Sequence, residues 1–351
     1  MDRLGALQLE YITASEGSPQ RRRGVLGGAL YDRPKEETRA ANGDLGFPVA
    51  QVSTPVLGHE REVLELWRIG DEVRSGTHGR VRYTCGSDIV FGSLSLHEEE
   101  APAAASEPGG RTPLYEITAR AYREVFATLA AVGHPHLLRV WNFIPDINVE
   151  TEGLERYRQF NSARQEALIA CGREVAGNVP AASALGAASG SPLVVYFLAA
   201  RVAPALIENP RQVSAYHYPP QYGPRSPAFS RAAVLGRSDA ATLFISGTAS
   251  IVGHRTMHTG DPAAQTRETL RNIEALLEEA GRKALGDRLP LESLAYKVYV
   301  RDPRDLPVIR AELTRALGRE ASVLYLKADI CRRDLAVEIE AVGGRGLKPG
   351  S

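Results

Sequence analysis

Hydrophobic side chains recur with helical spacing in two segments that lie far apart in the chain. In residues 119–133 (ARAYREVFATLAAVG) apolar positions follow one another every three or four residues, and a glycine ends the pattern. Residues 266–281 (TRETLRNIEALLEEAG) repeat this arrangement, and Asp261-Pro262 provides a capping carboxylate and a first-turn proline before it. Both segments are therefore predicted to be helices that bury one face.

Segments of strand-like composition surround each predicted helix in the same order. An apolar run with small residues precedes the helix, a β-rich run ending in aspartate follows it, and a further helix and a closing strand come next. In the first half these are residues 88–96, 138–146, 154–170 and 193–199, and in the second half residues 243–252, 296–302, 306–317 and 324–330. A single matched pair arises by chance in any α+β protein, whereas four matched element types indicate a duplicated β-β-α-β-α-β unit.

The duplication divides the chain into three parts. Residues 1–45, rich in Gly, Arg, Pro and Glu, are predicted to be an N-terminal arm that is partly mobile. Residues 46–203 form the first copy, and residues 204–351 form the second. The expected architecture is therefore α+β, with two tandem domains in one chain.

Composition and charge exclude several classes of protein. The 351 residues include 42 Lys+Arg and 42 Asp+Glu, so bulk electrostatics do not favour nucleic acid or an anionic membrane as a partner. The three cysteines show no CxxC spacing, which argues against a disulfide framework and a structural zinc site. With neither a signal-peptide pattern nor an apolar run of membrane-spanning length, the sequence predicts a cytoplasmic protein.

A loop in the second copy concentrates side chains that recognise small anions. Residues 209–231 carry Arg211, Tyr216, Tyr222 and Arg225 between prolines that fix the turns. Guanidinium and phenol groups in such a loop suit a small carboxylate with an apolar ring. Taken from composition alone, an ordered surface loop explains the same residues.

Two further features place candidate chemistry in the second copy. In SGTAS, Gly247 allows a ligand to approach the backbone of a buried strand, and Thr248 offers a hydroxyl beside it, although a strand glycine also marks a simple bulge. In the last strand, period-two alternation puts Glu338 and Glu340 on one face, where an acid pointing into a cleft would have a raised pKa. Residues 194–198, the corresponding strand of the first copy, contain no acid, so one chemical site is expected.

Two other groups of polar residues give weaker indications. Asn161 and Arg164 lie one turn apart in the predicted helix of residues 154–170, so both side chains can reach one ligand, although most helical arginines are simply solvated. His254 and His258 have the spacing of a zinc helix but lack the glutamate of a metalloprotease motif. No metal site is therefore predicted.

The second half of the sequence resembles the RidA-like, or chorismate-mutase-like, fold. The resemblance rests on Ser246-Gly247, Gly260-Asp261, Gln265, Asn272 and residues 337–341 (VEIEA). It implies clefts between β-sheets and, in the deaminases of that group, an arginine that anchors the substrate carboxylate. Residues 180–183 and 320–322, at the matching positions, lack this arginine, so imine deamination is not expected.

The tandem arrangement and four long motifs closely resemble the chorismatases. The motifs are HLLRVWNFIPDIN (136–148), ERYRQFNSAR (155–164), NPRQVSAYHYPPQYGPRSP (209–227) and SGTASIVGH (246–254). The resemblance implies an enzyme that acts on chorismate and releases pyruvate without a metal or an organic cofactor. Its products often serve as starter units for secondary metabolites.

The resemblance also assigns roles to individual residues. It implies that Glu338 protonates the enolpyruvyl methylene carbon and that cationic side chains hold the two carboxylates of chorismate. The expected anchors are Arg164, Arg225, Tyr216 and Asn161, with Arg211, Tyr222 and Thr248 as further candidates. Gly247 and Cys331 stand where the enzymes that form 3-hydroxybenzoate have glycine and cysteine.

This pattern predicts a 3-hydroxybenzoate synthase. In that branch the ring hydroxyl of the substrate displaces pyruvate, and the ring then becomes aromatic. A chorismate hydrolase, which yields a dihydroxycyclohexadiene carboxylate, is the alternative within the family. A RidA-like protein that binds a small acid without turning it over is the alternative outside enzymes. The expected assembly is a monomer or a small homo-oligomer.

Overall fold

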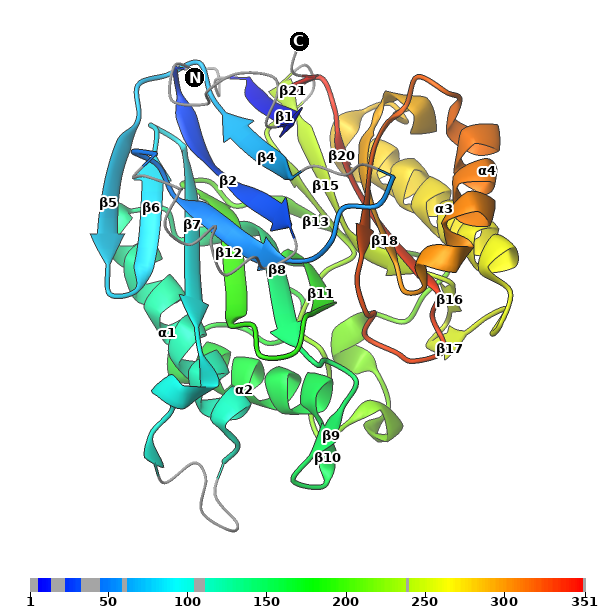
Figure 1. The fold of residues 1–351 in the computed structure, drawn as a ribbon. Helices are drawn as coiled ribbons and strands as arrows, with labels where there is room; N and C mark the ends of the chain where they lie inside the picture. Colours follow the sequence, from blue (N-terminus) through cyan, green and yellow to red (C-terminus); the bar gives the residue numbers. More distant parts are fainter. Residues whose placement is uncertain are drawn as a thin grey trace.

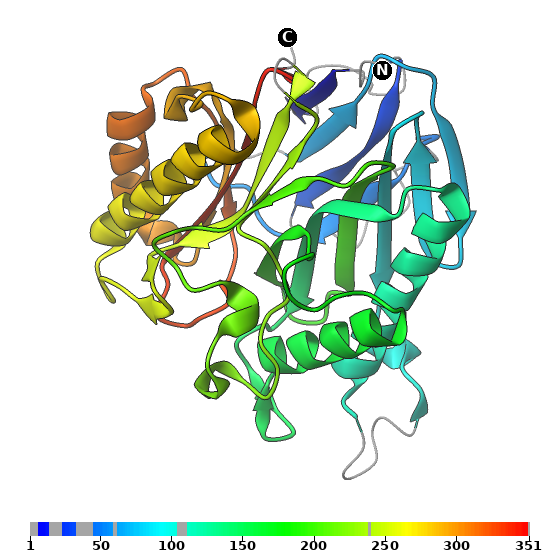
Figure 2. The same ribbon diagram turned by 180° about the vertical axis from the view of Figure 1, so that it is seen from behind.

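The computed structural model describes residues 6–13, 23–32, 45–58, 62–103, 111–237 and 240–349. Their strands form three large sheets, and the helices cover two of these sheets on the outside of the molecule (Figures 1 and 2). None of the helices in these ranges combines the length and apolar character needed to cross a membrane.

The first unit is a six-stranded sheet with the order β11-β8-β12-β7-β6-β5. Its elements are β5 (Arg74–His78), β6 (Val81–Cys85), β7 (Ile89–Leu96), α1 (Pro113–Val132), β8 (His136–Pro145), α2 (Arg156–Ala170), β11 (Ala181–Ala187) and β12 (Leu193–Ala200). The Thr112 hydroxyl caps the start of α1, and Gly133 ends this helix in the left-handed conformation with φ 69°. The glycine predicted to end the first helix therefore does so.

The second unit repeats this topology with the strand order β13-β14-β15-β20-β18-β19. Its elements are β13 (Ala205–Ile207), β14 (Ala232–Leu235), β15 (Thr242–Ala249), α3 (Pro262–Ala280), β18 (Ala295–Val300), α4 (Leu306–Leu317), β19 (Ser322–Lys327) and β20 (Val337–Gly343). Asp261 caps α3, as its position before Pro262 indicated. The expected α+β fold with a tandem repeat is confirmed.

The repeated unit contains two more strands than the sequence indicated. Each copy runs β-β-β-α-β-α-β-β, because a short first strand and the strand after the second helix also belong to its sheet. Residues 193–199 were matched to residues 324–330, but β12 occupies the sheet position of β20, and β19 corresponds to β11. The small residues of β11 (AASALGA) gave no apolar strand pattern, which explains why this strand was missed.

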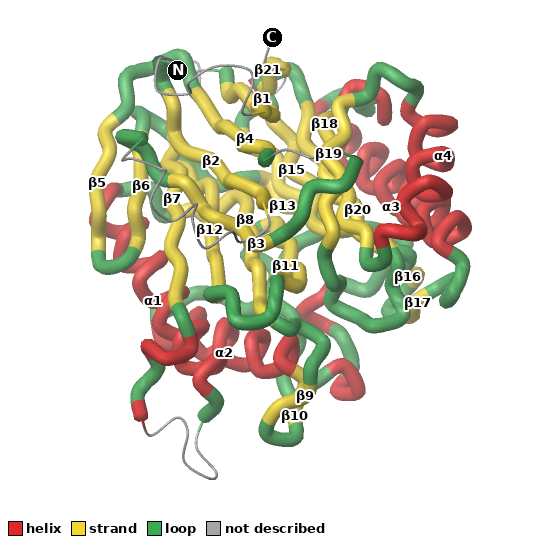
Figure 3. The backbone as a smooth tube through the Cα atoms, in the orientation of Figure 1, coloured by secondary structure: helices red, strands yellow, loops and turns green. Residues whose placement is uncertain are grey.

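A third sheet, with the order β21-β1-β4-β2-β3, packs against the faces of the two units that their helices leave open (Figure 3). It comprises β1 (Leu7–Thr13), β2 (Val25–Asp32), β3 (Val49–Ser53), β4 (Val63–Arg68) and β21 (Leu347–Pro349). Two of these strands fall in the predicted arm of residues 1–45, so that part of the arm is a structured sheet. The basic run Arg21-Arg22-Arg23 begins outside the described residues.

The three sheets share one interior, in which polar groups lie among aromatic rings. Its apolar members come from all three sheets and include Trp67 on β4, Trp141 on β8 and Phe244 on β15. Separate apolar layers lie between the first sheet and α1 and α2, and between the second sheet and α3 and α4. Ser246 and Gly247 on β15 hydrogen-bond to residues of β11, so the two units meet along these strands.

Candidate active site

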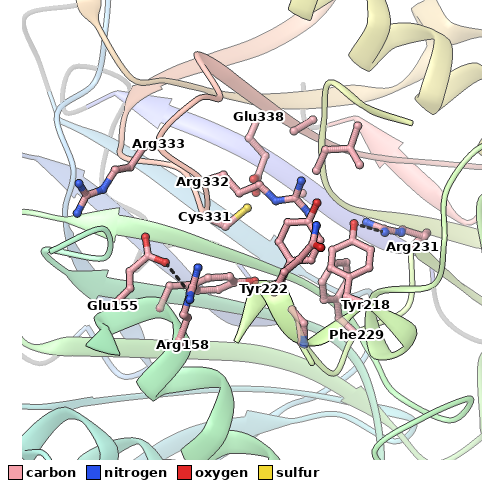
Figure 4. A pocket seen from close by; sticks show the side chains of 16 residues that line it. Glu155, Arg158, Tyr218, Tyr222, Phe229, Arg231, Cys331, Arg332, Arg333 and Glu338 are labelled. Carbon is pink, nitrogen blue, oxygen red and sulfur yellow. Dashed lines mark hydrogen bonds and ion pairs between the residues drawn. The ribbon is translucent and has the colours of Figure 1, made fainter. Parts of the chain in front are cut away.

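A cavity of about 400 Å³ lies at the junction of the two units (Figure 4). The start of α2 from the first unit forms one wall, and β15, β20 and neighbouring loops of the second unit form the others. The lining residues are Glu155, Tyr157, Arg158, Tyr218, Gln221, Tyr222, Pro227, Phe229, Arg231, Gly247, Ala249, Ile251, Cys331, Arg332, Arg333 and Glu338. The size is that of a site for a small molecule, for which roughly 300–1,000 Å³ is typical.

The carboxyl group of Glu338 projects into this cavity from the second residue of β20. Only 4% of the residue is exposed, and it pairs with Ala249 on β15 and Tyr299 on β18. Burial, and to a smaller extent the charge of Glu340, raise the pKa of Glu338 to about 8, although Arg139 and Arg231 act in the opposite direction. The side chain therefore carries a proton at neutral pH and is able to act as a general acid.

A β-bulge in β15 makes room for this carboxyl. The register between β15 and β20 shifts between Ile245 and Thr248, so Ser246 and Gly247 form the bulge. A methyl group added at Gly247 would lie 1.9 Å from Glu338 Oε1, well inside contact distance. Glycine is therefore required here by the close approach of the acid, and the backbone N–H of Gly247 donates to Ser183 Oγ at 2.9 Å.

Arg301 holds the loop that brings Cys331, Arg332 and Arg333 to the cavity. Its guanidinium donates to the carbonyl oxygens of Ile330, Arg332 and Leu335 at 2.8–3.0 Å and pairs with Asp329 at 2.6 Å. Burial and then the nearby Glu338 raise the pKa of the Cys331 thiol to about 12. Cys331 is therefore a neutral, compact group beside the acid.

Arginine side chains give the cavity an excess of positive charge. Arg158 pairs with Glu155 at 3.4 Å, but Arg231, Arg332 and Arg333 form no ion pair with any described carboxylate. Arg231 is 4% exposed and Arg332 stacks on Tyr222 with its Cζ 4.2 Å from the ring centre. Arg231 Nε and Arg332 Nη2 are buried and have no hydrogen-bond partner in the described structure. Such unpaired donors suit an anionic ligand.

Four of the residues selected from the sequence meet at this cavity. Glu338, Cys331, Gly247 and Tyr222 all line it. The Tyr222 hydroxyl donates to the carbonyl oxygen of His254 at 2.6 Å, which fixes the ring at the edge of the site. These groups come from three separate stretches of the chain.

Asn161 and Arg164 lie behind the cavity wall instead of on it. Both are buried in α2, and Arg164 Nη2 donates to Asn161 Oδ1 at 2.9 Å while its guanidinium lies over Phe160. Arg164 is close enough to lower the pKa of Tyr157, a lining residue whose pKa burial raises more strongly. The two expected anchors therefore support a cavity residue.

The other four candidates have different surroundings. Arg211 pairs with Glu268 and donates to Asn272 Oδ1, both at 2.5 Å, and the Thr248 hydroxyl donates to the Ser246 carbonyl at 2.8 Å. Tyr216 packs against the core of the first unit and the ring of His217. Arg225 is exposed on its loop, and none of the four lines the cavity.

Sequence reasoning missed the arginines that do line the cavity. Arg231 stands at the end of the recognised loop, Arg158 is inside the ERYRQFNSAR motif, and Arg332 and Arg333 follow Cys331 directly. Each lay beside a selected residue, but no periodic pattern separates a buried arginine from a solvated one. Position in the folded chain decided the difference, because Arg164 is buried away from the cavity whereas the exposed Arg333 lines it.

The paired histidines do not form a metal site. His254 contacts Tyr222, whereas His258 lies 3.6 Å from Glu268 on α3. Across the described ranges, no group of three or more His, Cys, Asp or Glu side chains is arranged to hold a metal ion.

Comparison with known proteins adds an independent line of evidence. Residues 65–199 match the family model described as "Chorismatase FkbO/Hyg5-like, N-terminal". The chain is 36% identical to a chorismatase of Streptomyces rapamycinicus over 97% of its length and 96% of the relative, and 37% identical to a 3-hydroxybenzoate synthase of Streptomyces hygroscopicus over 85% and 86%. A chorismatase crystal structure superimposes with a TM-score of 0.84 at 32% identity, covering 98% of this chain and 100% of that one.

Proposed function

Because the chain belongs to the chorismatase family, we propose that it converts chorismate into 3-hydroxybenzoate and pyruvate. The observation that carries the proposal is Glu338, a carboxyl with a pKa of about 8 that faces an arginine-lined cavity. An acid of this kind suits an acid-labile enol ether such as that of chorismate.

The charge of the cavity matches that of the substrate. Chorismate carries two carboxylates, and Arg231, Arg332 and Arg333 are the lining cations without a described carboxylate partner. We assign the anchoring of the carboxylates to Arg231 and Arg332, whose free N–H groups are desolvated. This assignment replaces Arg211, which is already paired with Glu268.

The reaction begins with proton transfer from Glu338 to the methylene carbon of the enolpyruvyl group. The resulting oxocarbenium ion weakens the ether bond to the ring, and the neighbouring ring hydroxyl displaces pyruvate. Loss of a proton then makes the ring aromatic. One proton enters and one leaves, so chorismate gives 3-hydroxybenzoate and pyruvate without consuming water.

The surroundings of Glu338 favour this branch over hydrolysis. Gly247 lets the acid lie against the backbone, and Cys331 fills space beside it as an uncharged thiol. Neither group offers a carboxylate or imidazole that would activate water. The hydrolase reaction shares the protonation step and differs only in the nucleophile.

Incubation with chorismate tests the proposal directly. We expect stoichiometric release of pyruvate, followed by a lactate dehydrogenase coupled assay, and of 3-hydroxybenzoate, identified by chromatography and mass. Glu338→Gln should lower turnover by roughly two powers of ten or more, because it keeps the shape but removes the proton. Glu278→Gln, whose side chain is 67% exposed on α3, is the matched control.

Each alternative gives a different result. Pyruvate with a dihydroxycyclohexadiene carboxylate in place of 3-hydroxybenzoate would identify a hydrolase. Binding of chorismate without pyruvate above background would identify a binding protein and refute the enzymatic proposal. Ammonia from a 2-imino acid would indicate a deaminase.

A further inference from the structure

A second buried carboxylate, Glu340, lies two residues after Glu338 on the same face of β20. Only 3% of it is exposed. Its Oε1 is 2.8 Å from Lys297 Nζ, and its Oε2 is 2.6 Å from Arg139 Nη2. The indole of Trp141 and the hydroxyl of Ser183 donate to the same carboxylate, each at 2.7 Å. Two cations and two neutral donors thus stabilise the ionised form of Glu340.

The same contacts connect all three sheets. Lys297 on β18 also pairs with Glu65 on β4 at 2.6 Å, so one ammonium group joins the second unit to the N-terminal sheet. Arg139 on β8 belongs to the first unit. The described cluster has two acids, Glu65 and Glu340, and two bases, so its net charge is zero. Because the cluster has no surplus negative charge, protonation of Glu340 is not needed for neutrality.

Ser183 links this cluster to Gly247, which lines the cavity. Its hydroxyl donates to Glu340 Oε2 and accepts from Arg139 at 2.5 Å and from the Gly247 N–H at 2.9 Å. Gly247 is the residue over which the Glu338 carboxyl lies. Glu338 and Glu340 are therefore parts of one rigid assembly, with side chains about 7 Å apart at the strand repeat.

We propose that Glu340, acting in the chorismatase reaction proposed above, is a positioning residue whose fixed negative charge keeps the proton on Glu338. A second negative charge on the same buried strand face is disfavoured, so Glu338 stays protonated until substrate arrives. Once Glu338 has given its proton to the methylene carbon, the same repulsion makes it a stronger base. It then recovers the proton that leaves the ring, and the net count of protons is unchanged.

The charged and titratable groups around Glu338 are consistent with this assignment. They are Glu340 on the same strand, Arg139 on β8, Arg231 before β14, Arg301 after β18, Cys331 and Arg332 in the preceding loop, Tyr157 on α2 and Tyr299 on β18. Glu340 is the carboxylate among them that raises the pKa of Glu338, and the arginines oppose it. Glu155 also lines the cavity, where it pairs with Arg158 at 3.4 Å. Burial would raise the pKa of Glu340 as well, but Lys297 and Arg139 hold it at about 2.

Replacing each acid of the cluster in turn distinguishes an electrostatic effect on Glu338 from a general disturbance of the buried cluster. Glu340→Gln removes the negative charge next to Glu338, whereas Glu65→Gln removes an equally buried partner of Lys297 on a different sheet. The carboxylic C=O infrared band that Glu338→Gln abolishes reports the protonation of Glu338 without substrate. A loss of this band near pH 8 is expected in the wild type.

We expect Glu340→Gln to move this midpoint down by at least about one pH unit, and Glu65→Gln to leave it in place. The high-pH limb of kcat/KM for pyruvate release should move with it. An unmoved midpoint in Glu340→Gln, or an equal movement in Glu65→Gln, would overturn the inference. Absence of pyruvate from the wild type would refute the proposed function and leave the infrared titration decisive for Glu340.

A second variant can be used if Glu340→Gln does not fold. Glu340→Gln combined with Lys297→Met removes one acid and one base, so Glu65 and Arg139 keep the cluster neutral. The Glu338 midpoint should still move down, but by less than in Glu340→Gln, because a cation beside Glu340 is lost together with the acid. Glu340→Asp, which keeps the charge, should restore the wild-type midpoint, and a midpoint as low as that of Glu340→Gln would contradict an electrostatic role.

Discussion

Replacement of Glu338 by glutamine should stabilise the protein at alkaline pH while it lowers turnover by roughly two powers of ten or more. Glu338 has a pKa of about 8 in the folded chain, against 4.5 as the ordinary value. Between these two values the folded state holds a proton that the unfolded state has released. Stability therefore falls as pH rises through this window, because the side chain must either keep its proton or ionise in a buried site.

The size of the effect follows from this difference. About 3.5 pH units at about 1.4 kcal/mol each give about 5 kcal/mol above pH 8, and about 3 kcal/mol at pH 7. Since only 4% of Glu338 is exposed, solvent screening does not remove this penalty. Glutamine has nearly the same shape and pays no ionisation cost.

Urea denaturation of both proteins at pH 5 and at pH 9 measures the effect. The difference in the free energy of unfolding should grow in favour of Glu338→Gln by several kcal/mol between these two pH values. Glu340→Gln should behave differently: the pKa of Glu340 is lowered to about 2, so its stabilising contribution is already complete at pH 5. That variant should be less stable than the wild type at both pH values. A constant difference between wild type and Glu338→Gln would refute a buried, protonated Glu338.

Three further substitutions test the cavity. Gly247→Ala places a methyl group 1.9 Å from Glu338 Oε1, so turnover should fall at least about tenfold and the remaining product should shift toward the hydrolysis product on chromatography. Cys331→Ala should retain pyruvate release but lower the 3-hydroxybenzoate fraction, and an unchanged fraction would exclude a role in the branch. Arg332→Leu should raise KM about tenfold or more in steady-state kinetics, because a desolvated carboxylate anchor is lost. Arg120→Leu, on α1 and paired with Glu124, should leave KM unchanged.

The local pattern of the chain was enough to find the repeat. Helical spacing, with Gly133 at the end of one segment and Asp261-Pro262 at the start of the other, identified the helices that became α1 and α3, because capping and amphipathicity are short-range properties. Strands that lack an apolar run, such as β11, could not be identified from the pattern of hydrophobic residues. The sequence did not show the N-terminal sheet as a unit: β1 and β2 fell in the predicted arm, β3 and β4 in the first copy, and β21 in the second.

For the candidate site too, the sequence predicted local features, whereas burial and distant charges became known only from the structure. Alternation along β20 put Glu338 and Glu340 on one face, but it did not show that both are buried; the expectation left room for one of them to be solvated. Their opposite pKa directions depend on Lys297 and Arg139, which come from other strands. A buried cation 43 residues away in the chain has no signature in the strand itself.

The sequence by itself determined the duplicated α+β unit, the presence of an acid in the second copy alone and the family to which the motifs point. These are properties of short segments, in which periodicity, capping and residue identity act over a few positions. The tertiary structure decided which arginines line the cavity and which of two neighbouring glutamates has the raised pKa. Those outcomes depend on desolvation and on charges brought together from three sheets, and burial and distance exist only once the chain has folded.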